Sequence, residues 1–245
     1  MTVYGIIPAR AGSKSLPDKN ITLLMGHPLL SYSITTALQC DFIDQVYVTS
    51  DSEDILNIAE NYGAKRVLRP PQISGDLSRD VEYLKHFATT VDGIKESDVV
   101  VLLRPTHPLR NVSLLSEAFK RYQSTENIHS LRSMKRSQEI FFKSWHINSD
   151  GFAIPLINDW PGIVDATNAP RQILPKTFYQ DGYIDIFSFD TVLNLGSTSG
   201  VKVLPFFIEE FSVDIDTSAD MDLIIKYLRD NQLPKWFKLP IPKQT

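Results

Sequence analysis

Three cations and a glycine stand close together near the start of the chain. Arg10, Lys14 and Lys19 follow the apolar run Val3–Ile7, and Gly12 gives the backbone between them conformational freedom. Backbone N–H groups and cationic side chains on one such loop can converge on a phosphate chain. The spacing matches neither the P-loop nor the dinucleotide-binding fingerprint. A solvated basic loop is the simpler alternative.

Two carboxylates near the other end of the chain could hold a metal ion. Asp214 and Asp216 fall in the stretch 212–216, which we interpret as a short strand. Residues two apart in a strand share a face, so both carboxylates could reach one cation. Mg²⁺ is typically bound through one or two carboxylates together with substrate phosphates. The alternative is a pair of exposed acids, with Thr217 capping the following helix.

Alternating strands and helices must position these residues. The apolar pattern predicts strands at 3–7, 45–50, 65–68, 98–103, 128–134, 182–189, 201–206 and 212–216. It predicts helices at 29–38, 55–62, 79–91 and 111–122, and a last helix after residue 217. The alternation over the first 134 residues implies βαβ units. We therefore expect an α/β fold, a Rossmann-like three-layer sandwich with a mainly parallel central sheet.

The expected sheet brings several polar residues to one edge. Ligands of such sheets bind beyond the carboxyl ends of the strands. The Arg10 loop, Asp51, Arg69 and Arg104 each follow a predicted strand. We expect them to share one cleft.

The pattern changes between Lys135 and Lys176, where aromatic residues, prolines and asparagines interrupt any period. We interpret 135–176 as an inserted arm within a single 1–245 domain, and 233–245 as an extended tail. An aromatic, weakly regular segment suits a surface that contacts another subunit. A simple covering loop is the alternative.

Composition excludes some classes of protein. A hydrophobic content of 42% suffices for one sizeable core, and a net charge of −4 argues against nucleic-acid binding. Cys40 is the one cysteine, so an internal disulfide is excluded. No apolar run reaches membrane-spanning length, and the first strand leaves no room for a signal peptide. We expect a cytoplasmic protein that does not bind membranes.

Ordered blocks resemble the acylneuraminate cytidylyltransferases, the enzymes that make CMP-sialic acid and related CMP-nonulosonates. The loop Pro8-Ala9-Arg10-x-x-Ser13-Lys14-x-Leu16-Pro17-x-Lys19-Asn20 resembles their signature loop, with Ser15 where the family usually has glycine. The other blocks are Ser50-Asp51, Arg69-Pro70, Pro105-Thr106-x-Pro108-Leu109-Arg110, Arg171-Gln172-x-Leu174-Pro175, Gly182 and Asp214-Ile215-Asp216-Thr217.

The resemblance implies a nucleotidyltransferase fold and a reaction that depends on CTP and Mg²⁺. The anomeric hydroxyl of a nonulosonic acid of the sialic, legionaminic or pseudaminic type would attack the α-phosphate, and pyrophosphate would leave. An alternative substrate is a 3-deoxy-octulosonic acid or an amino variant. A non-catalytic nucleotide-binding relative is the alternative from another class, although retention of Lys19, Asp214 and Asp216 together speaks against it.

The resemblance also implies roles for individual residues. Arg10, Ser13 and Lys19 would hold the triphosphate, assisted by Lys14. Asn20 would contact the ribose, Arg69 the cytosine, and Asp214 with Asp216 the Mg²⁺; Arg10, Lys19 and Asp216 would be catalytic. Arg171 and Gln172 lie on the arm that in relatives crosses to the neighbouring subunit and helps complete its sugar site, which implies a homodimer.

Three positions depart from the family pattern. Arg104 stands where glutamine is common, His107 where serine is usual, and Asp181 where asparagine is usual. A charge at position 104 needs an acceptor, which is either an acid of the protein or an oxygen-rich group of the sugar. Our hypothesis is that Arg104 contacts the sugar.

Overall fold

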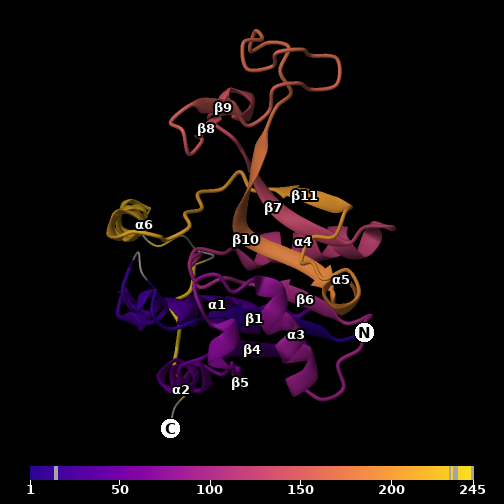
Figure 1. Ribbon diagram of the computed structural model, residues 1–245. Coiled ribbons are helices and arrows are strands. Elements are labelled where there is room, and N and C mark those ends of the chain that lie inside the picture. The colour runs from indigo at the N-terminus through magenta and orange to yellow at the C-terminus, as the bar shows by residue number, and fades with distance from the viewer. Residues whose placement is uncertain (14–15, 232, 234–236, 244–245) are drawn as a thin grey trace. The chain divides into compact units, whose positions relative to one another are not determined.

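The computed structural model describes residues 1–13, 16–231, 233 and 237–243. They fall into two compact units. The first consists of Met1–Ser133 and Gly182–Thr245, and the second of Met134–Asp181. Figure 1 shows the elements of both units along the chain.

Within the described residues, a seven-stranded sheet in the order β11-β7-β10-β6-β1-β4-β5 forms the centre of the first unit. Its strands are β1 (Val3–Pro8), β4 (Gln45–Ser50), β5 (Lys65–Leu68), β6 (Val99–Leu102), β7 (Ser130–Arg136), β10 (Phe178–Ser188) and β11 (Val203–Phe207). Strand β1 runs parallel to β4 and β6, and β4 runs parallel to β5, whereas β10 is antiparallel to β6. The predicted mainly parallel sheet is confirmed.

Helices cover both faces of this sheet. They are α1 (Leu29–Leu38), α2 (Glu53–Asn61), α3 (Asp80–Thr90), α4 (Val112–Ser124) and α5 (Phe189–Leu193), whereas α6 (Ser218–Asp230) packs elsewhere. In β1, Val3 and Ile7 pack in a buried cluster with α1, α2 and α4, whereas Tyr4 and Ile6 pack with α3 and α5. This alternation follows from strand geometry and produces the three layers that the sequence predicts. Figure 1 shows α3 across β1 and β4.

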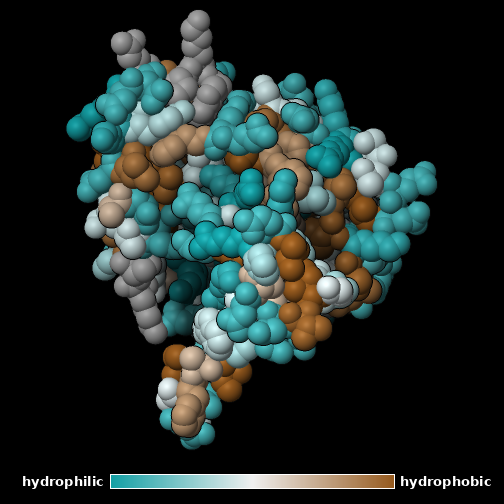
Figure 2. Space-filling model, turned by 90° about the horizontal axis from the view of Figure 1, so that it is seen from above, coloured by the Kyte–Doolittle hydropathy of each residue, from teal (hydrophilic) through white to brown (hydrophobic). Residues whose placement is uncertain are grey.

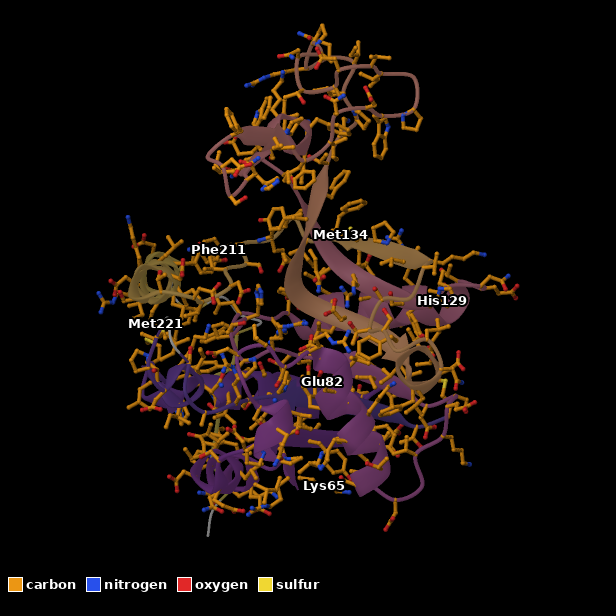
Figure 3. The ribbon with its side chains drawn as sticks, viewed as in Figure 1. Lys65, Glu82, His129, Met134, Phe211 and Met221 are labelled. Atoms are coloured by element: carbon orange, nitrogen blue, oxygen red, sulfur yellow. The ribbon has the colours of Figure 1, made fainter. Side chains whose placement is uncertain are left out.

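Helix α6 packs on a third cluster, which includes Met221 (labelled in Figure 3), Leu109 and Ile215. Thr217 begins the helix with a capping box, in which its hydroxyl accepts from the Asp220 N–H and the Asp220 carboxylate accepts from the Thr217 N–H. The helix start predicted at residue 217 is confirmed.

The strand predicted at 212–216 is wrong. All five residues are described, and none belongs to a strand. The Ile215 N–H donates to the Thr106 carbonyl oxygen at 2.9 Å, and Ile215 is buried while Asp214 and Asp216 are exposed. A single extended residue that packs inward, Ile215, therefore gives the alternation of exposed and buried positions that is typical of a strand. The segment itself does not belong to a sheet.

Short elements that the sequence did not indicate connect the main ones. In the first unit these are the 3₁₀ helices η1 (Lys19–Ile21) and η2 (Pro71–Ile73), and the hairpin of β2 (Leu23–Leu24) and β3 (His27–Pro28).

In the C-terminal stretch, residues 232, 234–236, 244 and 245 of the predicted tail lie outside the described residues. Residues 237–243 are described and belong to no helix or strand. No helix in the described part of the chain is long and apolar enough to cross a membrane.

The second unit has a small core of its own, formed by Phe142, Ala166, Ala169 and Leu174. It contains the 3₁₀ helix η3 (Phe141–Lys143) and the hairpin of β8 (Trp145–Ile147) and β9 (Ala153–Pro155). Many of its large apolar side chains are exposed: Phe141, Trp145, Ile147, Phe152, Ile154, Leu156, Trp160, Val164, Ile173, Phe178 and Tyr179. The space-filling view likewise shows hydrophobic surface open to solvent on the face drawn (Figure 2).

Candidate active site

The loop after β1 is fixed at the carboxyl end of the sheet. The Ala11 N–H donates to Asp51 Oδ1 at 2.9 Å, which ties the loop to the end of β4. The Asn20 side-chain amide donates to the Arg10 carbonyl oxygen at 2.8 Å, which ties the loop to η1. These bonds position the Arg10 side chain.

Two of the predicted phosphate-binding cations are paired with carboxylates. Arg10 Nη1 lies 2.7 Å from Asp76 Oδ1, and Lys19 Nζ lies 2.8 Å from Asp216 Oδ1. The Lys19 side chain is 13% exposed, whereas that of Asp216 is 65% exposed. Lys19 is thus held mostly within the protein, and its partner is open to solvent.

The remaining loop residues of the predicted site differ in how they are placed. Ser13 is half-buried, and Asn20 is buried in η1 with its amide on the Arg10 carbonyl. Lys14 lies outside the described residues. The contacts of Ser13, Lys14 and Asn20 with a nucleotide remain predictions.

A cavity of about 200 Å³ opens beside the loop. Its lining consists of Pro8, Arg10, Asn20, Arg69, Gly75, Asp76, Ser78, Asp80, Tyr83, Arg104, Pro105 and Thr106. Arg10, Arg69 and Arg104 come from the ends of three different strands. The prediction that the sheet brings them to one cleft is confirmed for these three arginines, whereas Asp51, which was predicted to join them, is not part of the lining and instead accepts the Ala11 N–H.

Arg69 forms one wall of this cavity and is 4% exposed. Its Nη2 donates to the Thr49 carbonyl oxygen at 2.7 Å, and its guanidinium lies 4.5 Å from the ring centre of Tyr83. Within the described residues its Nε is buried without a hydrogen-bond partner. Burial lowers the pKa of Arg69, because the charged form loses solvation. An acceptor on a ligand would therefore stabilise this group.

Arg104 is bound by two acids of the protein. Its Nη1 lies 2.7 Å from Asp185 Oδ2, and its Nη2 lies 2.6 Å from Asp80 Oδ2. Asp80 begins α3, on the same turn as Glu82, which is labelled in Figure 3. Burial alone would lower the pKa of Arg104, but the charges of Asp185 and Asp80 outweigh it and raise the pKa above its usual value.

The sequence left two kinds of acceptor open for Arg104, an acid of the protein and an oxygen-rich group of the sugar. The structure shows that acids of the protein accept its hydrogen bonds. Asp185 is completely buried on β10, and Arg132 approaches its other oxygen with Nε at 3.6 Å from Oδ1. Two arginines thus face one buried carboxylate behind the cavity. The charge of Arg104 is compensated without a sugar.

A buried arginine holds the loop that follows β6. Arg110 donates from Nη1 to the His107 carbonyl oxygen at 2.6 Å and from Nη2 to the Arg104 carbonyl oxygen at 2.8 Å. Its Nε donates to the Tyr183 carbonyl oxygen at 2.6 Å. These bonds fix the backbone that carries Arg104 and His107 against β10.

The predicted metal ligands lie on the extended segment before α6. Their side chains are 46% exposed for Asp214 and 65% exposed for Asp216, and Asp214 Oδ1 is 3.8 Å from His107 Nε2. Among the described residues, no group of three or more His, Cys, Asp or Glu side chains is arranged to hold a metal ion. Two accessible carboxylates nevertheless fit Mg²⁺, which completes its coordination with water and substrate phosphate.

Arg171 and Gln172 lie in the second unit. They line a cavity of about 340 Å³ there, together with Arg136, Glu139 and Lys176 among others. This cavity is formed entirely by residues of the second unit. The sequence prediction that these residues complete the sugar site of a neighbouring subunit stays a prediction.

Sequence reasoning missed four residues of the first cavity or its support: Asp76, Asp80, Tyr83 and Asp185. A signal was present for Asp185, because a charged residue inside the apolar strand Tyr183–Phe187 needs a partner. The residues that follow β4 offer Asp51 or Ser52 as a cap of α2, and in the structure the N-cap is Ser52, whose hydroxyl accepts the Ile55 N–H.

Comparison with known proteins points to one family. The family model described as Cytidylyltransferase matches residues 4–147, more than half of the chain. An N-acylneuraminate cytidylyltransferase of Escherichia coli is 33% identical over 228 residues, which cover 91% of this chain and 51% of the relative. A CMP-N,N'-diacetyllegionaminic acid synthase of Legionella pneumophila is 37% identical over 132 residues, 51% of this chain and 55% of the relative.

The chain spans about half the length of the Escherichia coli relative, and the match to the Legionella pneumophila protein covers about half of each chain. A solved structure of CMP:2-keto-3-deoxy-manno-octonic acid synthetase complexed with CTP matches with a TM-score of 0.69 at 14% identity. The match covers 94% of this chain and 100% of the other, and shows that the fold is shared. The family-model match, which starts in β1 and takes in the loops of Arg10, Arg69 and Arg104, shows that the chain belongs to the cytidylyltransferase family.

Proposed function

We propose that this chain transfers CMP from CTP to a nonulosonic acid of the sialic, legionaminic or pseudaminic type. The observation that carries the proposal is the cavity at the sheet edge, where Arg10, Asn20 and Arg69 converge next to the Lys19–Asp216 pair. Relatives named for sialic and legionaminic acid favour this sugar class over an octulosonic acid, because the octonic acid synthetase supports only the fold.

In the proposed reaction, the anomeric oxygen of the sugar forms a bond to the α-phosphorus of CTP. The bond from that phosphorus to the bridging oxygen breaks, pyrophosphate leaves with the electron pair, and the hydroxyl proton is released. Arg10 and Lys19 would hold the phosphates and offset the charge that grows on pyrophosphate. Their positions on a loop tied to β4 and η1 support this role.

The nucleoside would occupy the enclosed part of the cavity. A volume of about 200 Å³ is smaller than that of typical complete ligand sites, so it would enclose only part of CTP. The buried Nε of Arg69 is a donor suited to the base, as the resemblance implies. Asn20 would contact the ribose, and Ser13 and Lys14 would contact phosphates. Arg104, held by Asp80 and Asp185, would brace the wall.

Asp214 and Asp216 would hold Mg²⁺, which when bound supplies positive charge to the phosphates. Asp216 already lies beside Lys19, so a metal ion there would adjoin the cation that holds the phosphates. The solvent accessibility of the Asp214 and Asp216 carboxylates supports this assignment.

We further propose a homodimer formed through the second unit. The exposed apolar side chains of this small unit, among them Ile147, Phe152 and Val164 at 65%, 69% and 85%, exceed what a solvated surface needs. Arg171 and Gln172 would then contact the sugar bound to the partner subunit.

Pyrophosphate release tests the proposed function. The enzyme would be assayed with CTP, UTP, GTP and ATP against N-acetylneuraminic, legionaminic, pseudaminic and 3-deoxy-octulosonic acids. The expected result is release with CTP and one of the nine-carbon sugars. Preference for the octulosonic acid would favour the second sugar class, and CTP binding without release under any condition would favour a nucleotide-binding protein.

A further inference from the structure

A tight turn forms the wall of the cavity opposite the Arg10 loop. The Ser78 N–H donates to the Gly75 carbonyl oxygen at 3.1 Å, and buried Ser74 anchors the base of the turn by donating to the Pro70 carbonyl oxygen at 3.0 Å. Leu77 at the tip is 94% exposed. Three residues of this turn line the cavity: Gly75, Asp76 and Ser78.

Asp76 forms an ion pair with Arg10, in which Asp76 Oδ1 lies 2.7 Å from Arg10 Nη1. The two side chains are 37% and 35% exposed, so water reaches the pair from the cavity. Arg10 is the cation proposed to hold the triphosphate. A carboxylate at this position competes with phosphate for the guanidinium and repels it as a like charge.

We propose that Asp76 is an exchangeable counter-ion of Arg10, which the phosphates of the nucleotide displace, and that it thereby sets the affinity for CTP and for pyrophosphate. The proposal rests on the proposed function for the identity of the nucleotide. Lys19 and Asp216 make a similar pair, but Asp216 is expected to remain at the phosphates by binding Mg²⁺. Asp76 has no such expected role.

The geometry makes the displacement feasible. An ion pair with both members about one third exposed is weak, so phosphate can replace the carboxylate at a cost of roughly two- to fivefold in affinity. The turn is anchored at Ser74 and at the start of α3, whereas its tip is exposed. The exchange therefore needs no movement of the anchors of the turn.

The same exchange would act on the product. Pyrophosphate would bind Arg10 as the triphosphate does, and Asp76 would compete with pyrophosphate as it competes with CTP. Return of Asp76 to Arg10 would favour release of pyrophosphate. The residue would thus weaken binding of both the substrate and the product.

The test is Asp76→Asn, with Asp76→Ser as a second variant. Calorimetry without sugar would measure binding of CTP and, separately, of inorganic pyrophosphate, each in the presence and in the absence of Mg²⁺. We expect both variants to bind both ligands about two- to fivefold more tightly than the wild type. Asp92→Asn is the matched control, because this exposed acid beyond the C-terminal end of α3 removes the same charge away from the cavity.

The double variant Arg10→Gln/Asp76→Asn tests whether Asp76 acts through Arg10. Relative to Arg10→Gln alone, removal of Asp76 should change the affinity for either ligand by less than about twofold. An equal gain in both backgrounds would overturn the exchange and indicate general repulsion.

Unchanged or weaker binding by Asp76→Asn would also overturn the proposal. Weaker binding only in the presence of Mg²⁺ would identify Asp76 as a metal ligand instead. A wild type that fails to bind CTP would refute the proposed function, whereas its binding of pyrophosphate would still test Asp76. Failure to bind either ligand would refute both.

Discussion

At the scale of single residues, the candidate site is a set of paired charges. Arg10 with Asp76 is an accessible pair, and Lys19 has an accessible partner in Asp216, whereas Arg104 bridges Asp80 to the completely buried Asp185. Accessible pairs can be exchanged for ligand charges at small cost, but a buried carboxylate without its cation is expensive. The two kinds of pair therefore have different roles, binding and bracing.

Replacing Arg104 tests the bracing role. Arg104→Gln leaves buried Asp185 with Arg132, so we expect the free energy of unfolding to fall by about 2–3 kcal/mol in urea denaturation. Arg66→Gln is the control, because Arg66 pairs with the exposed acids Glu53 and Glu60 and should cost much less. We expect use of CTP and of the sugar to suffer together. Equal stability of the two variants, with a selective loss of sugar use, would restore the hypothesis that Arg104 contacts the sugar.

Replacing Asp216 tests the metal site. Asp216→Asn should keep its melting temperature, since the side chain is largely exposed, but turnover should fall by roughly a hundredfold or more. Kinetics at increasing Mg²⁺ would measure this, with exposed Asp222→Asn on α6 as the control for lost charge. Near-wild-type turnover of Asp216→Asn at saturating Mg²⁺ would remove Asp216 from the site.

At the scale of elements, the start of α6 controls where the two carboxylates lie. Asp220 accepts the N–H groups of both Asp216 and Thr217, at 3.1 and 2.8 Å. The hydrogen bonds from the Thr217 hydroxyl and N–H lower the pKa of Asp220, because they stabilise its charged form. The capping box thus fixes the backbone of Asp216.

The pH dependence of stability tests this cap. Because the pKa of Asp220 is lower in the folded state, its contribution is present above the unfolded carboxyl pKa of about 4 and is lost as the pH falls through the folded value. Asp220→Asn should therefore be less stable than wild type by about 1 kcal/mol at pH 7, and the difference should shrink below pH 4. Urea denaturation at both pH values measures it. A difference that does not change with pH would contradict the assignment.

Sequence periodicity predicted most of these elements, because burial on one or both faces leaves a direct pattern. The strands at 45–50 and 65–68 were predicted to the residue. The antiparallel direction of β10 was not predictable, since the apolar pattern of a strand is the same in either direction. The segment 212–216 imitates a strand because Ile215 alone packs inward.

The candidate site was predicted where a side chain follows a strand, as Arg10, Arg69 and Arg104 do. It was not predicted where a residue enters from a turn or from a strand that is distant in the sequence. Asp76 lies on a turn with no periodic signal, and Asp185 pairs with a residue 81 positions earlier in the chain. Such pairings depend on tertiary structure, which spacing does not encode.

At the scale of the whole molecule, the second unit carries the prediction of a homodimer. Sedimentation or light scattering at assay concentration should show a dimer, because its exposed apolar side chains would be buried between subunits. A double substitution, Ile147→Glu with Phe152→Glu, should yield monomers with reduced sugar use but retained CTP binding. A stable, fully active wild-type monomer would refute the homodimer.

The fate of labelled phosphate tests the proposed transfer most directly. The protein would be incubated with a nonulosonic acid and with CTP labelled at either the α- or the γ-phosphate, and the products separated. We predict that α-label appears in the CMP-sugar and γ-label in pyrophosphate, and that Arg10→Gln slows both equally. Transfer of γ-label to the sugar, or release of label without a CMP-sugar, would contradict it.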